Sequence, residues 1–286
     1  MNTERSEVTG ATPAPGAPLL DIRGLRIEGF ADEKWNPIIK GVDLTLHRGE
    51  VLGLIGESGA GKSTLGLAAM GFARSGVRFA GGSVRFDGMD LLAMPEWTRR
   101  KLWGTRMTYV AQSAAASFNP AHRLIDQTVA AAVREGLKSE AEAIADAKAL
   151  YAQLQLPDPE HIGVRYPHQV SGGQLQRGMT AMAMSGRPDL IVFDEPTTAL
   201  DVTTQVEVLM SMRKIVEEFD TAAIYITHDL AVVAQMADRI KVLRHGEEVE
   251  EAETREMLAH PKQAYTKSLW SVRSLRKQAD PSEDVV

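Results

Sequence analysis

Cysteine is absent from the 286 residues of this chain. Its absence excludes disulfide bonds, thiolate nucleophiles and iron–sulfur clusters held by cysteine. Long apolar runs are missing too: no stretch approaches the roughly 20 residues that span a bilayer, and the N-terminus carries no basic-then-apolar export signal. With a mean hydropathy of −0.17, these features predict a soluble globular protein that stays in the cytoplasm.

Positive charge is in slight deficit, because 32 Lys and Arg residues face 38 Asp and Glu residues, for a net charge of −6. The sequence contains no long basic run. A nucleic-acid partner is therefore not indicated, whereas a membrane partner stays possible.

The composition divides the chain into three parts. Residues 1–18 are rich in Thr, Pro, Gly and Ala, and such a segment cannot bury enough apolar surface to fold. Residues 19–275 are ample for one large domain with inserted subdomains. Residues 276–286 form an acidic tail that we expect to be disordered.

Two kinds of strand pattern alternate with helical stretches. Apolar and polar residues alternate in segments 20–28, 41–46 and 82–86, which predicts an antiparallel sheet. Short apolar runs rich in β-branched residues, typical of a buried parallel sheet, occur at 51–55, 107–111, 190–193, 222–226 and 240–243. The sequence therefore predicts an α/β fold.

The strand signal disappears between residues 117 and 187. Residues 127–156 are rich in Ala, Glu, Leu and Lys at helical spacing, and Pro157 and Pro159 end this pattern. We expect a mostly helical insertion here.

Residues 56–64 read GESGAGKST, directly after the apolar run 51–55 and ahead of a helical segment. The glycines allow successive N–H groups to point at phosphate oxygens, while Lys62 can reach the β- and γ-phosphates and Ser63 can ligate Mg²⁺. A glycine-rich turn with a helix-capping serine is the structural alternative. The predicted phosphate-binding residues are Gly56, Glu57, Ser58, Gly59, Ala60, Gly61, Lys62, Ser63 and Thr64.

A second motif ends the apolar run at residues 190–193 with Asp194 and Glu195. On a strand neighbouring the phosphate loop, Asp194 would lie beside the Mg²⁺ held by Ser63, and Glu195 could accept a hydrogen bond from an attacking water. A strand-end cap is the alternative.

A third motif points to a family. Residues 170–177 read VSGGQLQR and resemble the signature of ABC-transporter ATPases, shortly before the acidic strand as in that family. In the same order as in the family, Gln112 resembles the Q-loop glutamine, residues 198–201 the D-loop and His228 the switch histidine. Over residues 19–275, the chain is identified as a member of this family, which implies a P-loop NTPase ABC ATPase core with an antiparallel β subdomain and an inserted helical subdomain.

The resemblance implies that two ATPase domains pack head to tail around ATP. Ser171 and Gly173 of one domain, with Gly172 and Gln174 in the same motif, would face the γ-phosphate bound to the other domain. Asp201 would lie at the dimer interface. A helix-starting loop is the local alternative for the signature residues.

The resemblance also implies the catalytic and metal-binding groups. Glu195, His228 and Gln112 would surround the lytic water and the γ-phosphate, and Ser63, Gln112 and Asp194 would hold Mg²⁺. Taken singly, Gln112 could be a solvated side chain and the residues around His228 a helix cap. Either Phe30 or Trp35, both expected in the loop after the first strand, would stack on adenine, unless they pack under that loop.

Further motifs resemble the dipeptide, oligopeptide and nickel importer ATPases. They are SFNP at 117–120, RYPHQ at 165–169, DEPTTALDVT at 194–203, and HP at 260–261 followed by AYT at 264–266. Thr197 and Thr198 resemble the first of the two unlike ATPase subunits of those importers. Residues 111–114 depart from the family's Phe-Gln-Asp/Glu-Pro, and the cysteine cluster of many first-type subunits is missing, so no iron–sulfur cluster is expected.

The implied function is that of the ATP-hydrolysing subunit of a binding-protein-dependent importer for peptides or peptide-like solutes. Its partners would be a second ABC ATPase, two transmembrane permeases and an extracytoplasmic solute-binding protein, with the chain peripheral on the cytoplasmic face of the cell (inner) membrane. Alternatives are an importer for a nickel chelate, opine, glutathione or sugar conjugate, a soluble ABC ATPase acting on ribosomes or DNA, and a non-catalytic regulatory half. The intact Lys62, Asp194, Glu195 and His228 disfavour the last.

Overall fold

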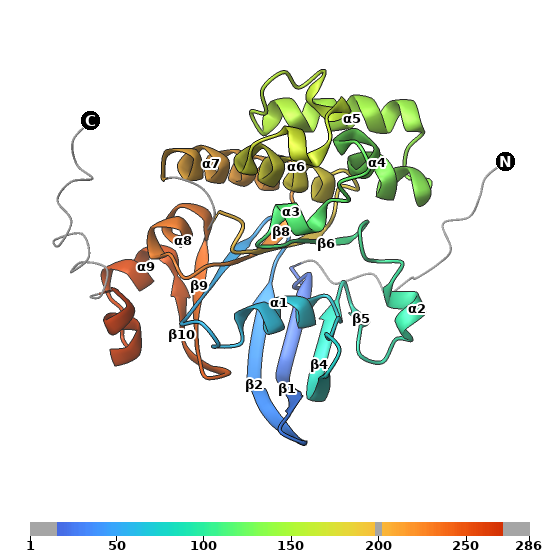
Figure 1. Ribbon diagram of the computed structural model, residues 1–286. Helices are drawn as coiled ribbons and strands as arrows, with labels where there is room; N and C mark the ends of the chain where they lie inside the picture. The colour runs from blue at the N-terminus through green and yellow to red at the C-terminus, as the bar shows by residue number, and fades with distance from the viewer. Residues whose placement is uncertain (1–15, 198–201, 271–286) are drawn as a thin grey trace.

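Two β-sheets and a group of helices make up the computed structural model, which describes residues 16–197 and 202–270 (Figure 1). In this view the antiparallel sheet lies at the bottom, the parallel strands lie above it, and most of the helices gather at the top.

The antiparallel sheet has the strand order β2-β1-β4-β5. Its strands are β1 (Leu20–Ala31), β2 (Lys34–Leu46), β4 (Val77–Phe86) and the short β5 (Met89–Asp90). The three strands predicted here are confirmed, and each is longer than its alternating pattern indicated.

The expected loop around Phe30 and Trp35 is wrong. The two residues face each other across β1 and β2, and only Asp32 and Glu33, both with positive φ, form the turn. A two-residue turn with this backbone matches the twist of a hairpin, and a cross-strand aromatic pair stabilises it.

The larger sheet has the order β10-β9-β3-β8-β7-β6. Its strands are β3 (Val51–Ile55), β6 (Met107–Val110), β7 (Leu190–Asp194), β8 (Ala222–Ile226), β9 (Arg239–Arg244) and β10 (Glu247–Glu253). The five strands predicted from apolar runs pair in parallel, while β10 pairs antiparallel with β9. Sequence patterning missed β10 because five of its seven residues are glutamates.

Two hydrophobic clusters use opposite faces of this sheet. Leu52 and Leu54 of β3 join a cluster that also contains Leu65 and Ala68 of α1 (Lys62–Ala69), together with apolar residues of the antiparallel sheet. Helix α1 is thus packed between the two sheets. On the other face, the second cluster contains residues of α6 (Gly172–Met184), α7 (Val202–Glu218) and α8 (Leu230–Met236).

Between residues 117 and 187 the regular elements are helical. They are α4 (Leu124–Arg134), α5 (Glu140–Gln153), the 3₁₀ turns η1 (Ile162–Val164) and η2 (Pro167–Gln169), and α6. The helical pattern over 127–156 does not form one helix: Gly136 has a φ of 66°, and Ser139 begins α5 with a capping box to Glu142.

Three further short helices are α2 (Glu96–Arg99), α3 (Ala114–Ser117) and α9 (Thr254–Ala259). Residues 264–270, after α9, are helical as well. Of the helices in residues 16–197 and 202–270, none combines the length and apolarity that a membrane span requires.

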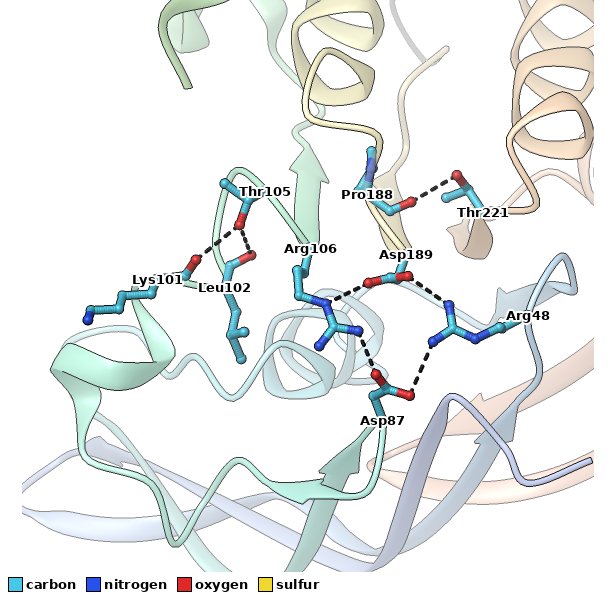
Figure 2. Close-up of polar contacts among 9 residues, drawn as sticks. All are labelled: Arg48, Asp87, Lys101, Leu102, Thr105, Arg106, Pro188, Asp189 and Thr221. Atoms are coloured by element: carbon cyan, nitrogen blue, oxygen red, sulfur yellow. Dashed lines mark hydrogen bonds and ion pairs between the residues drawn. The ribbon is translucent and has the colours of Figure 1, made fainter. Parts of the chain in front are cut away.

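A ring of four charged side chains joins the two sheets (Figure 2). Arg48 donates to Asp189 at 2.7 Å and to Asp87 at 3.1 Å. Arg106 donates to the same two carboxylates at 2.7 Å and 2.6 Å. Arg48 lies in the turn that connects β2 to β3, and Asp87 lies in the turn between β4 and β5. Because the other two residues directly precede β6 and β7, the ring fixes the two sheets to each other.

Candidate nucleotide site

The loop between β3 and α1 has a backbone that requires glycine. Gly56 and Gly61 have φ values of 153° and 97°, and a Cβ atom on Gly56 would lie 2.2 Å from the carbonyl oxygen of Leu243. A Cβ atom on Gly61 would lie 2.7 Å from Ile39 Cδ1. At Gly59, by contrast, a Cβ atom would meet nothing within 4 Å, so the middle of the loop borders open space where an anion can sit.

Lys62 begins α1 and folds back over this loop. Its Nζ atom donates to the carbonyl oxygens of Gly56 at 2.7 Å and Glu57 at 2.9 Å. Burial lowers the pKa of Lys62, and the nearby Glu195 and Asp194 carboxylates oppose that shift. An ammonium group has three N–H donors, so a phosphate oxygen can take the third.

Asp194 meets the loop through Ser63, whose hydroxyl donates to Asp194 Oδ1 at 2.9 Å. The prediction that the two motifs lie on neighbouring strands is wrong, since β8 separates β3 from β7. The contact forms because α1 lies across β7 and β8, which brings its first turn to the end of β7.

Sequence reasoning missed Tyr109 of β6, which donates to the other oxygen of Asp194. Burial raises the pKa of Tyr109, and the hydrogen bond and charge of Asp194 raise it further, so the phenol keeps its proton. No local sequence motif indicates this role, because the partner of Tyr109 is 85 residues further along the chain.

Glu195 brings the three predicted catalytic residues together. Gln112 Nε2 donates to Glu195 Oε2 at 3.3 Å, and His228 Nδ1 lies 3.2 Å from Glu195 Oε1. The three residues follow the carboxyl ends of β6, β7 and β8, which are adjacent in the sheet. Glu195 has a φ of 48°, a left-handed conformation that is costly for a residue with a side chain and that concentrates at functional sites.

The signature residues begin a helix. Ser171 is the N-cap of α6, its hydroxyl accepts from the Gln174 N–H at 3.3 Å, and Gln174 Oε1 accepts from the Ser171 N–H at 3.1 Å. Among the described residues, no hydrogen bond or ion pair joins segment 171–174 to the phosphate loop of this chain. Residues 198–201, including Asp201, lie outside the described residues.

Phe30 and Trp35 are exposed, at 54% and 38%, so neither packs beneath a loop. Their ring centroids lie 5.3 Å apart, and the Arg78 guanidinium lies 4.0 Å from the Trp35 centroid. Either ring stays a candidate for adenine.

The residues present fit a nucleoside triphosphate and a divalent cation. The loop offers a backbone turn built on glycines and a buried ammonium group for the phosphates. Ser63 and Asp194 place a hydroxyl and a carboxylate side by side, and Mg²⁺ prefers such oxygen ligands. The fold and this site together define a phosphate-loop nucleoside triphosphatase.

Comparison with known families narrows this class. Residues 39–198 match the family model described as ABC transporter, and the chain belongs to this family. It is an ATP-binding ATPase of that family.

Curated relatives match most of the chain. The probable peptide ABC transporter ATP-binding protein of Sinorhizobium fredii is 37% identical, covering 88% of this chain and 75% of the relative. The oligopeptide transport ATP-binding protein of Salmonella typhimurium is 35% identical, covering 91% and 78%. The dipeptide transport ATP-binding protein of Haemophilus influenzae is 38% identical, covering 92% and 79%.

Solved structures agree with the fold. A bacterial ABC transporter cassette, solved as a dimer, superposes with a TM-score of 0.73 at 25% identity, covering 82% of this chain and 99% of the cassette. A dimeric ATP-binding cassette bound to ADP and phosphate gives the same TM-score at 24% identity.

Proposed function

We propose that this chain is the ATP-hydrolysing subunit of a binding-protein-dependent importer for peptides or peptide-like solutes. The observation that carries the proposal is the convergence of Gln112 and His228 on Glu195, beside the Lys62 loop and Asp194. The peptide assignment is supported by the names of the relatives, which are transport proteins for peptides, oligopeptides and dipeptides.

Within this proposal, each side chain has a distinct role. Lys62 and the loop N–H groups bind the β- and γ-phosphates, and Ser63, Asp194 and Gln112 hold Mg²⁺. When bound, the ion neutralises charge on the phosphate oxygens. Glu195 accepts a hydrogen bond from the attacking water and polarises it.

His228 and Gln112 keep the Glu195 carboxylate oriented by contacting one oxygen each. We also assign to His228 a contact with the γ-phosphate. Because the Glu195 backbone is strained, these two contacts and the Glu195 N–H bond to Ile226, at 2.9 Å, hold the side chain where the reaction needs it.

The proposed ATP site is completed by a second ATPase. Segment 171–174 has no described bond to the phosphate loop of its own chain, and its helix N-terminus is suited to an anion. Ser171, Gly172, Gly173 and Gln174 would therefore face the γ-phosphate held by a second subunit, with Asp201 at the interface. The dimeric state of the two solved cassettes supports this arrangement.

The remaining partners follow from the transport assignment. They are two transmembrane permeases, an extracytoplasmic solute-binding protein and a second, unlike ABC ATPase, with the chain peripheral on the cytoplasmic face of the membrane and no nucleic acid bound. Related solutes, such as nickel chelates, opines, glutathione and sugar conjugates, are the alternatives to peptides.

The proposed ATPase domain comprises residues 19–275, and its helical subdomain comprises residues 117–187.

The proposal is tested by tagging the full chain, extracting membranes gently and identifying copurifying proteins by mass spectrometry. Two permeases and a different ABC ATPase are expected, and an unrelated tagged soluble protein serves as the control. Copurification of ribosomes or nucleic acid, or of the chain alone, would contradict the transport assignment.

A further inference from the structure

The segment after α9 reaches the phosphate loop from the far end of the chain. The Glu57 N–H donates to the Tyr265 hydroxyl at 3.2 Å, across 208 residues of sequence. We propose that Tyr265 positions the phosphate loop and thereby couples segment 262–270 to nucleotide binding. This inference rests on the role proposed above for residues 56–64.

Segment 262–270 is held against the rest of the domain by hydrogen bonds and by apolar packing. Glu250 of β10, which is only 9% exposed, accepts the backbone N–H of Lys262 at 2.7 Å and that of Gln263 at 3.0 Å through its two carboxylate oxygens. Two N–H groups therefore fix the start of the segment to the edge of the larger sheet. Thr266 is fully buried, and Leu269 and Trp270 pack against the larger hydrophobic cluster.

The Tyr265 side chain is held in place on its ring face as well as at its hydroxyl. The Arg244 guanidinium, at the end of β9, lies 4.6 Å from the ring centroid, a cation–π distance. Burial raises the pKa of Tyr265, so the hydroxyl stays neutral and accepts the Glu57 N–H at physiological pH.

Glu57 links Tyr265 to the phosphate-binding ammonium. Its N–H is held by Tyr265, while its carbonyl oxygen accepts from Lys62 Nζ at 2.9 Å. Two hydrogen bonds thus connect the C-terminal segment to Lys62 through one residue. Loss of the hydroxyl frees the first turn of the loop, and ordering that turn around phosphate then costs more conformational entropy.

Coupling of this kind is reciprocal. If Tyr265 favours the loop conformation that binds nucleotide, bound nucleotide must in turn stabilise the contact with segment 262–270. The segment therefore reports whether the phosphate loop is filled, and a partner that binds the segment would change nucleotide affinity.

The test uses the full-length chain and ADP as the probe. In the wild type, ADP should slow hydrogen exchange in both segment 56–61 and segment 262–270. In Tyr265→Phe, which keeps the ring and removes the hydroxyl, ADP affinity should fall about three- to tenfold, the range expected for one hydrogen bond. The ADP-dependent protection of 262–270 should disappear, whereas that of 56–61 should persist.

A matched control lies in the same segment. Ser268 Oγ donates to the Tyr265 carbonyl oxygen at 2.7 Å, so Ser268→Ala removes a bond within the segment and leaves the contact with Glu57. Its ADP affinity should match the wild type, and thermal melting confirms that both variants are folded.

Two results distinguish a failure of the Tyr265 coupling from a failure of the phosphate-loop assignment. If Tyr265→Phe binds ADP as tightly as the wild type and still protects 262–270, the coupling is wrong while the loop assignment stands. If the wild type does not bind ADP, or binds it no better than Lys62→Ala, the phosphate-loop assignment itself fails.

Discussion

Glu195 is the residue to which the proposed mechanism assigns the activation of water. Its backbone is left-handed, and its carboxylate lies between Gln112 and His228. A strained residue held by several independent contacts is typical of functional sites, because the surrounding fold must stabilise the strain. The geometry therefore supports the role of Glu195 without reference to its place in a motif.

Lys62 allows a direct test at the residue scale. Lys62→Ala should weaken ATP binding by at least about tenfold, because it removes the charge proposed to contact phosphate and the two hydrogen bonds that close the loop. Equilibrium titration with a fluorescent ATP analogue measures the change. Lys148→Ala, which removes a partly exposed lysine paired with Glu160, should bind as the wild type does. Equal affinity in both variants would contradict the assignment of the loop.

At the scale of elements, local patterns predicted local structure. The strand, glycine loop and helix around residues 51–69 follow from adjacent residues, as do the apolar parallel strands. The helical break at Gly136 was not predicted, because the surrounding composition is helical on both sides and the break depends on one backbone conformation.

Contacts between distant segments could not be predicted from such patterns. The Tyr109–Asp194 and Glu57–Tyr265 bonds join residues 85 and 208 positions apart, and neither tyrosine has a local signal for its partner. The pairing of Phe30 with Trp35 was missed for another reason, since the turn between them is only two residues long.

The charged ring in Figure 2 yields a prediction about stability. Asp87→Asn should lower the free energy of unfolding at pH 7 by about 1–2 kcal/mol, because Arg48 and Arg106 both lose a charged acceptor. Urea unfolding measures this, and Glu33→Gln, an exposed change in the β1–β2 turn, is the control. A difference within error of that control would show that the ring does not stabilise the joint between the sheets.

The stability difference between the wild type and Asp87→Asn should depend on pH, and the pKa of Asp87 sets the direction. Burial alone would raise the pKa of Asp87, but the hydrogen bonds and charges of Arg106 and Arg48 hold it below the ordinary value of 3.8. A depressed carboxyl pKa contributes stability above the unfolded-state pKa, and this contribution is lost as the pH falls through the folded-state pKa. The stability gap between wild type and Asp87→Asn should therefore shrink below about pH 4.

At the scale of the whole molecule, the proposed ATP site uses two separate parts of the chain. The phosphate loop and Glu195 lie at the ends of the parallel strands, whereas the signature begins α6 in the helical layer (Figure 1). Because segment 171–174 has no described bond to the loop of its own chain, the two parts are suited to act across a pair of ATPases.

Ser171→Ala tests this division. Nucleotide binding at the chain's own loop should be unchanged, while ATP hydrolysis by the assembled complex should fall at least about tenfold because the partner's γ-phosphate loses a contact. Loss of the N-cap should also cost about 1 kcal/mol of stability, so melting is measured alongside. Loss of nucleotide binding with full retention of stability would contradict the separation of the two parts.

The measurement that tests the central claim most directly is ATP hydrolysis and peptide uptake by the reconstituted complex carrying Glu195→Gln in this subunit. Nucleotide binding should be retained, since the phosphate-contacting groups remain, and ATP turnover at this site should fall about 10²-fold or more, with uptake lost in parallel. Ordinary turnover and uptake in this variant would contradict the account.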